Sequence, residues 1–291
     1  MMRAGKMRAS PGRKIFLGVT SGVLILVIMW KPMSGVLSNR SRREPVWEEK
    51  SLNWYLNDLK LFGPVNETPR KNTAVAFQNM GMEMIPHLRI RLQAKDSWSL
   101  PFWTWIDDRF SRQSSPPVYA TPAWMQKKQA LRAIPTLGFE AEPLIPELLE
   151  MLTDSELAYE AAWCLSSIGS ASIEPLVGIV SNPESLPLER SAGIYALGFL
   201  AHKKKITQCY PILLGCLDDS NDEVRKRSVI AVRNMPDIIP EAMEFIVRCT
   251  HHTSNPAVLK EAQKTLEFWQ HRYPDRIPQK YSDMLPKPTT D

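Results

Sequence analysis

The 291-residue chain contains little cysteine and little histidine. Its four cysteines form no C-x-x-C pair, and none of its five histidines stands at a zinc-ligand spacing from them. Cys209 and Cys216 are separated by about 10 Å of rise if they share one helix, which is too far for a disulfide. We therefore expect the cysteines to be small buried hydrophobic residues, and we expect no metal and no cofactor.

The short motifs that usually carry catalysis are also missing. The sequence has no His-Glu pair, no HExxH, no P-loop, no glycine-rich dinucleotide loop after a strand and no Gly-x-Ser-x-Gly. We therefore expect no catalytic residue and no enzyme activity.

Excess positive charge is absent from most of the chain. The net charge of +5 arises from residues 1–50, which hold 10 Lys and Arg against 3 acidic residues, whereas the remainder holds 26 basic and 28 acidic residues. A nucleic-acid-binding domain carries a basic face of its own, so we expect no nucleic-acid partner.

One long apolar run is present, and it lies near the N terminus. Five basic residues precede an uncharged segment from Ile15 to Trp30, which Lys31-Pro32 ends. This pattern favours a single-pass signal anchor or transmembrane segment over residues 1–37, followed by a polar tether over residues 38–50. A cleaved signal peptide is the alternative, although no Ala-x-Ala cleavage site follows. The preceding positive charge predicts a cell-membrane protein with its body on the exported side.

Pairs of one small and one apolar residue recur at steps of 31, 32, 35 and 34 residues. The pairs are Ala133-Ile134, Cys164-Leu165, Ala196-Leu197, Ala231-Val232 and Thr265-Leu266. Each lies in a helical apolar pattern, and a turn and a second helical pattern follow it. Such a period predicts an all-α solenoid of stacked helical hairpins, because one helix pair cannot bury its apolar face alone.

Glycine and proline recur within this frame, including an earlier copy at residues 73–93. In three copies a glycine stands just past the first helix, where we expect a left-handed backbone, and a proline stands near the first turn of the second helix. The glycines are Gly81, Gly138 and Gly169, and the prolines are Pro86, Pro146 and Pro175.

These residues resemble the HEAT repeat, and more closely the short bacterial variety called PBS-lyase HEAT-like, over residues 70–93 and 123–270. With the Trp54-Tyr55 helix, the chain also resembles exported HEAT-repeat proteins of verrucomicrobial and related bacteria, whose function is uncharacterised. The resemblance implies a right-handed, HEAT/ARM-like superhelix that holds a partner. The family name also leaves open a lyase-like accessory enzyme. A structural envelope protein is a further alternative.

An aromatic-rich segment interrupts the repeats at residues 94–122. The step from Ala76 to Ala133 is 57 residues, so roughly 24 residues are inserted. Trp98, Trp103 and Trp105 are candidate partner-binding residues, although aromatic clusters also close repeat arrays and lie at membrane interfaces.

The interruption divides the predicted body into four parts. They are N-terminal helices with a first repeat (51–93), the insertion (94–122), the main array (123–274) and a flexible tail (275–291). We expect the first repeat to stand apart from the other five.

Basic residues on the first helices are the remaining candidates for partner binding. Arg190 and Arg225 each stand six residues before a small-apolar pair, and Arg227 follows closely. The alternative for residues 225–227 is pairing with Asp222 and Glu223 on an exposed helix face. Residues 218–222 are expected to form a turn and N-cap. The function predicted is a non-catalytic scaffold that binds a protein or peptide partner, on a concave face of second helices near 143–153, 173–181, 207–218 and 238–250.

Overall fold

The structure, a computed structural model, describes residues 44–59, 70–96, 100–101, 121–252 and 255–284. The chain divides into two compact units. The first comprises Met1–Glu44 and Trp98–Thr121, of which only residues 44, 100–101 and 121 are described. The second comprises Pro45–Ser97 and Pro122–Asp291 and contains the helices and strands given below.

The expected N-terminal anchor over residues 1–37 lies outside the described residues. Within the described ranges, no helix combines the length and the apolar character needed to cross a bilayer.

The second unit begins with a small β-hairpin, formed by β1 (Val46–Trp47) and β2 (Lys50–Ser51), and the short helix α2 (Leu52–Asn57). Glu48 and Glu49 connect the strands with positive φ angles of 45° and 61°, as a two-residue hairpin turn requires. The Tyr55 hydroxyl donates a hydrogen bond to the Trp47 carbonyl at 3.2 Å, and Tyr55 itself is buried. The expected polar tether over residues 38–50 is therefore folded from Pro45 onward, because this packing fixes the hairpin.

Six first helices and five second helices follow in the part of the chain that the structure describes. The first helices are α3 (Lys71–Met80), α6 (Ala123–Leu137), α8 (Ala158–Ile168), α10 (Pro187–Lys203), α12 (Asp222–Val232) and α14 (Pro256–Arg272). The second helices are α4 (Ile85–Leu92), α7 (Ile145–Glu150), α9 (Ile173–Ser181), α11 (Tyr210–Gly215) and α13 (Ile239–His252).

Short 3₁₀ turns flank the second helices and follow α14. They are η1 (Gly81–Met84), η3 (Gly138–Leu144), η4 (Met151–Thr153), η5 (Ser170–Ser172), η6 (Thr207–Cys209), η7 (Cys216–Asp218), η8 (Pro236–Ile238), η9 (Pro274–Arg276) and η10 (Gln279–Met284).

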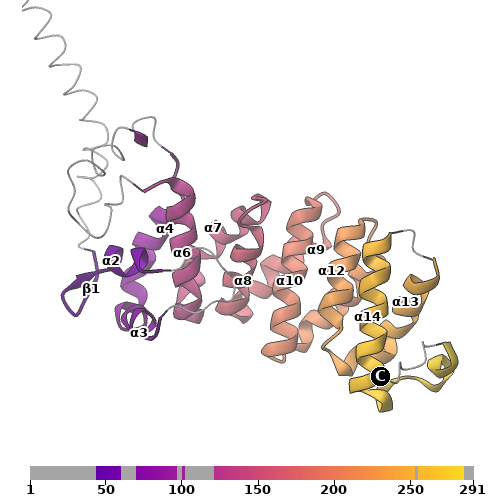
Figure 1. Ribbon diagram of the computed structural model, residues 1–291. Coiled ribbons are helices and arrows are strands. Elements are labelled where there is room, and N and C mark those ends of the chain that lie inside the picture. Colours follow the sequence, from indigo (N-terminus) through magenta and orange to yellow (C-terminus); the bar gives the residue numbers. More distant parts are fainter. Residues whose placement is uncertain (1–43, 60–69, 97–99, 102–120, 253–254, 285–291) are drawn as a thin grey trace, which may run out of the picture. The chain divides into compact units, whose positions relative to one another are not determined.

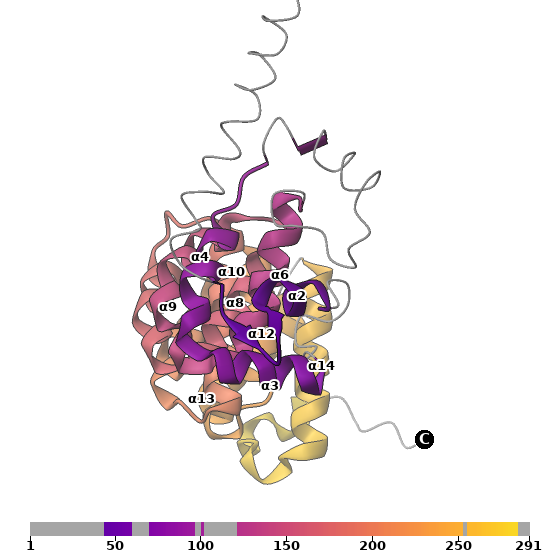
Figure 2. The same cartoon turned by 90° about the vertical axis from the view of Figure 1, so that its left-hand side faces the viewer.

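The helix pairs stack in chain order. From α6 to α14 each first helix packs against the next, and each of the five second helices also packs on the first helix that follows it (Figure 1). Viewed along the stack, α9 and α13 lie on one side, and α12 and α14 lie on the other (Figure 2). One continuous hydrophobic core runs through the unit from Leu52 to Tyr281. The prediction of an all-α solenoid of stacked hairpins is confirmed, with the β-hairpin as a small addition.

The first repeat does not stand apart, contrary to the expectation from the interrupted period. Helix α6 packs directly on α3 and α4, and the Ala123 amide donates to the Asp96 carboxylate at 2.7 Å across the interruption. Arg91, only 3% exposed, donates to Gln129 at 2.5 Å, and Gln129 donates to Asn57 at 2.7 Å. This polar network joins the first repeat to the main array, so the insertion leaves the stack of helices continuous.

The glycines behave as expected in φ but differ in ψ. Gly81, Gly138 and Gly169 have φ of 49°, 57° and 106°, with ψ of −134°, −126° and −137°. These angles lie in the mirror image of the β region and not in the left-handed helical region that the sequence predicted. Because only glycine adopts this region readily, the requirement for glycine at these three turns is confirmed.

The C-terminal segment is ordered further than the predicted tail. The ring of Tyr281 in η10 is 8% exposed and belongs to the core. The Trp269 indole, fully buried in α14, donates to the Arg233 carbonyl at 2.7 Å, at the C-terminal end of α12. Part of the segment that was expected to be loose is therefore packed against the hydrophobic core.

Candidate functional site

The three tryptophans predicted as partner contacts, Trp98, Trp103 and Trp105, lie outside the described residues. Their role stays a prediction.

Arg190 lies inside the stack. Its side chain is 8% exposed, and its guanidinium donates to the Asp219 carboxylate at 3.1 Å. Asp219 belongs to the turn that leads into α12, where the same carboxylate accepts the Asn221 amide at 2.8 Å. Arg190 therefore connects the repeat of α10 with the turn of the next repeat.

Arg225 also contacts the turn that leads into α12. Its guanidinium donates to the carbonyls of Asp219 at 2.7 Å and Ser220 at 3.1 Å, and it pairs with Asp222 one helical turn earlier. The adjacent Lys226 pairs with Glu223. The predicted pairing of residues 225–227 with Asp222 and Glu223 on the helix face is confirmed.

Arg227 contacts two aromatic rings from two earlier repeats. Its guanidinium carbon lies 4.6 Å from the ring centre of Tyr159 in α8 and 5.9 Å from that of Tyr195 in α10. The two rings meet edge to face, 5.8 Å apart. Burial raises the pKa of Tyr195, although the charge of Arg227 acts in the opposite direction. The three side chains connect three successive first helices. Tyr195 was missed in the sequence, where its spacing of 36 residues from Tyr159, close to the repeat period, was the available signal.

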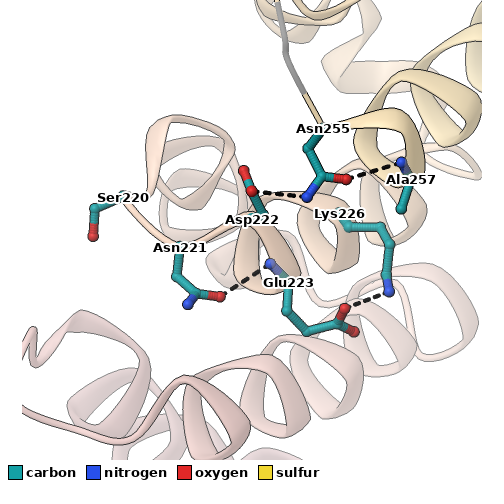
Figure 3. Close-up of a pocket in the computed structure, with 7 residues that line it drawn as sticks. All are labelled: Ser220, Asn221, Asp222, Glu223, Lys226, Asn255 and Ala257. Atoms are coloured by element: carbon teal, nitrogen blue, oxygen red, sulfur yellow. Dashed lines mark hydrogen bonds and ion pairs between the residues drawn. The ribbon is translucent and has the colours of Figure 1, made fainter.

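A polar cleft of about 430 Å³ opens between the first turns of α12 and α14 (Figure 3). Its lining residues are Ser220, Asn221, Asp222, Glu223, Lys226, Asn255 and Ala257.

The side chains in this cleft are engaged in helix capping. Asn221 accepts the backbone amide of Glu223 at 3.0 Å, and Asn255 accepts that of Ala257 at 2.9 Å. The Asn255 amide group donates to Asp222 at 2.7 Å. The predicted N-cap at residues 218–222 is confirmed, and the cleft is a joint between two repeats. Across the described ranges, no group of three or more His, Cys, Asp or Glu residues is placed to hold a metal.

The four cysteines are buried and unpaired. Burial raises the pKa of Cys209, Cys216 and Cys249 to about 11, and it also raises the pKa of Cys164 well above its usual value. A thiol is nucleophilic only as the thiolate, so these groups are inert near neutral pH. Their prediction as small buried hydrophobic residues is confirmed.

Glu160 is a buried carboxylate that the sequence analysis did not identify. Its Oε1 lies 3.6 Å from Arg132 and 3.8 Å from Lys128, both on α6. Burial raises the pKa of Glu160, and the two cations oppose this shift without cancelling it. The group joins α8 to α6.

The second helices present one equivalent exposed position per repeat. The sixth residue of each helix, counted from its first residue, is exposed in all five. These residues, here called the middle row, are Ile90, Glu150, Gly178, Gly215 and Glu244. A Cβ atom built on Gly178 or Gly215 would meet nothing within 4 Å, so the helix backbone itself is open to a partner there.

Partly buried apolar side chains lie next to the middle row. Leu149, Val177 and Leu214 immediately precede Glu150, Gly178 and Gly215, and each packs on the core while keeping part of its surface exposed. The repeat pattern predicts this face but not the alignment of its exposed residues.

No family model matches the chain, and no curated protein matches its sequence. Several solved structures are similar to it, each with a TM-score of 0.33. A designed armadillo repeat protein in complex with the peptide (KR)4 is 19% identical, and the match covers 76% of this chain and all of that one. A computationally designed armadillo repeat protein for modular peptide recognition is 17% identical over 63% of this chain and 99% of that one. An engineered protein is 18% identical over 74% of this chain and 62% of that one.

Proposed function

We propose that this protein is a non-catalytic helical-repeat scaffold that holds a protein or peptide partner on its second-helix face. The observation that carries the proposal is the middle row, in which five successive repeats expose an equivalent residue on one face. A solenoid offers such a surface because each repeat contributes the same position to it, which suits an elongated ligand better than a small molecule.

The proposal includes a HEAT-type, right-handed superhelix and a membrane tether. The glycine and proline frame at the helix ends supports the first. The basic residues followed by an uncharged apolar run at residues 15–30 support the second, with the repeats on the exported side of the cell membrane. Deleting residues 1–37 should move the protein from the membrane fraction to the soluble fraction.

Site-specific photo-crosslinking in cells tests the partner proposal. A photoreactive amino acid replaces Gly215 in the middle row of the full-length chain, and the control carries it at Lys264, an exposed residue of α14. We expect one reproducible crosslinked protein or peptide from position 215 and none from position 264. Failure to crosslink any reproducible partner from position 215, or from Gly178 in a second variant, would contradict the proposal.

A further inference from the structure

Charge is divided unequally between the two helix layers of the main array. The first helices α6, α8, α10, α12 and α14 hold 11 Lys and Arg against 6 Asp and Glu. The second helices α7, α9, α11 and α13 hold five glutamates and one arginine, Arg248. The 3₁₀ turns that flank those second helices add four carboxylates and no Lys or Arg. The near-neutral body is therefore acidic on its second-helix side.

Several of these carboxylates have no cation of their own. Glu147 pairs with Arg89 of α4 at 2.7 Å, and Asp218 pairs with Arg248 at 2.9 Å. Among the residues the structure describes, Glu150, Glu174 and Glu244 are exposed and form no ion pair within 4 Å, although the charge of Glu244 acts on Lys280 of η10. The charged side chains exposed on the second helices are thus mostly carboxylates.

The middle row combines two of these carboxylates, Glu150 and Glu244, with two exposed glycines. Glu150 and Glu244 stand at its two ends within the main array, and Gly178 and Gly215 stand between them. Glycine in a helix costs up to about 1 kcal/mol relative to alanine, and at these two positions no neighbouring atom would obstruct a Cβ. Packing therefore does not explain the glycines, whereas close approach of a partner backbone would.

We propose that the second-helix face binds an extended, positively charged segment of a protein, with its backbone over Gly178 and Gly215 and its basic side chains toward Glu150, Glu174 and Glu244. This assignment rests on the proposed function and adds the partner's chemistry to it. The negative charge of the second-helix face predicts a positively charged partner. The exposed edges of Val177 and Leu214 provide apolar contact between the charged ends.

The spacing of the helices sets the length of this segment. Neighbouring helices pack about 8–10 Å apart, so three steps from α7 to α13 span about 24–30 Å. An extended chain rises about 3.3 Å per residue, so about eight residues cover the distance. The partner should therefore carry basic residues about eight positions apart, with small or apolar residues between them.

Fluorescence anisotropy with the full-length, detergent-solubilised protein tests the assignment. The probe is a labelled peptide of about ten residues with an Arg pair at each end and an alternating Ser-Val centre, and its control has Glu pairs instead. We expect the Arg peptide to bind at least about ten times more tightly at low salt, and this preference should shrink as ionic strength rises. Equal binding of the two peptides, or no binding of either, would overturn the assignment.

Two sets of variants locate the site. Glu150→Lys, Glu174→Lys and Glu244→Lys together should weaken binding about tenfold or more. A control with the same change in charge, Glu156→Lys, Glu184→Lys and Glu267→Lys, reverses exposed carboxylates that do not lie on the second helices and should have little effect. The double variant Gly178→Gln, Gly215→Gln leaves the charge unchanged. It should weaken binding because the added side chains cover the exposed helix backbone at these two positions. Circular dichroism verifies folding of each variant, and equal loss in the two charge-reversal sets would refute the location.

The outcomes separate this inference from the proposed function. A partner crosslinked at position 215 that binds the charge-reversed protein as well as the original would leave the scaffold proposal standing and refute a basic segment. Sedimentation showing self-association that the Glu150, Glu174 and Glu244 reversals abolish would assign the face to a second copy of the chain, also overturning the inference.

Discussion

Two glycine-to-alanine substitutions in neighbouring repeats should change stability in opposite ways. Gly178 lies within α9, and an added Cβ there meets no atom within 4 Å. Gly198 lies within α10, and an added Cβ would come within 2.8 Å of the Ala231 Cβ and 3.4 Å of the Ala231 Cα on α12. Ordinary contacts between carbon atoms are about 3.5–4.0 Å, so Gly198→Ala forces α10 and α12 apart while Gly178→Ala does not.

The magnitude follows from two terms. Both substitutions gain about 1 kcal/mol of helix propensity, because alanine loses less backbone entropy than glycine. Gly178→Ala should therefore raise the free energy of unfolding by about 0.5–1 kcal/mol. Overpacking of a close helix contact costs about 1–3 kcal/mol. The two variants share the propensity gain, so Gly198→Ala should be about 1–3 kcal/mol less stable than Gly178→Ala.

Guanidinium unfolding followed by far-UV circular dichroism measures both values. The slope of the free energy of unfolding against denaturant concentration must be the same in all variants. A changed slope would mean that the repeat array no longer unfolds cooperatively, and the values could not be compared. Ala231→Gly removes the opposing methyl group, so in the Gly198→Ala background it should relieve the steric overlap. The double variant should then be about 1–3 kcal/mol more stable than the sum of the two single substitutions predicts. Equal stability of the two alanine variants, or additive effects in the double variant, would refute the close approach of α10 and α12.

Three further predictions follow from buried groups. The native protein should show no thiol reaction with an aromatic disulfide reagent at pH 8, whereas all four thiols should react in denaturant. A fast-reacting thiol in the native protein would contradict the raised cysteine pKa values. Because burial raises the pKa of Glu160 in the folded state, its contribution to stability should fall as pH rises above 4.5. Urea unfolding across pH 4–7 should therefore show a smaller decline in the free energy of unfolding for Glu160→Gln than for the original protein. Arg190→Met should lower the free energy of unfolding by about 2–4 kcal/mol by leaving Asp219 without its cation, and the added Asp219→Asn should restore part of that loss; full additivity would argue against the pair.

The repeat frame could be predicted because it depends on local chemistry. Gly138 and Gly169 mark turns that demand positive φ, Pro86 and Pro146 begin second helices, and Asn221 caps α12 within its own turn. Each of these requirements is met by residues close together in the chain, so the sequence displays it directly.

The continuity of the stack could not be predicted in the same way. The interrupted period suggested a separate first repeat, yet the Asp96–Ala123 hydrogen bond and the contact of Arg91 with Gln129 join it to the main array. These contacts connect residues 27 and 38 positions apart, and no local pattern marks them.

The sequence by itself determined that this chain is a helical-repeat solenoid, where several of its turns and helix caps lie, and that its cysteines are small buried residues, because backbone geometry and apolar periodicity are local properties. Only the tertiary structure decided which charged groups are available to a partner. Arg190, Arg225 and Arg227 were equal candidates in the sequence, and stacking places each against groups of the same or neighbouring repeats. Stacking also aligns Glu150, Gly178, Gly215 and Glu244 on one face. The identity of an exposed surface depends on which residues the repeats bury against one another, and that is settled only when they pack.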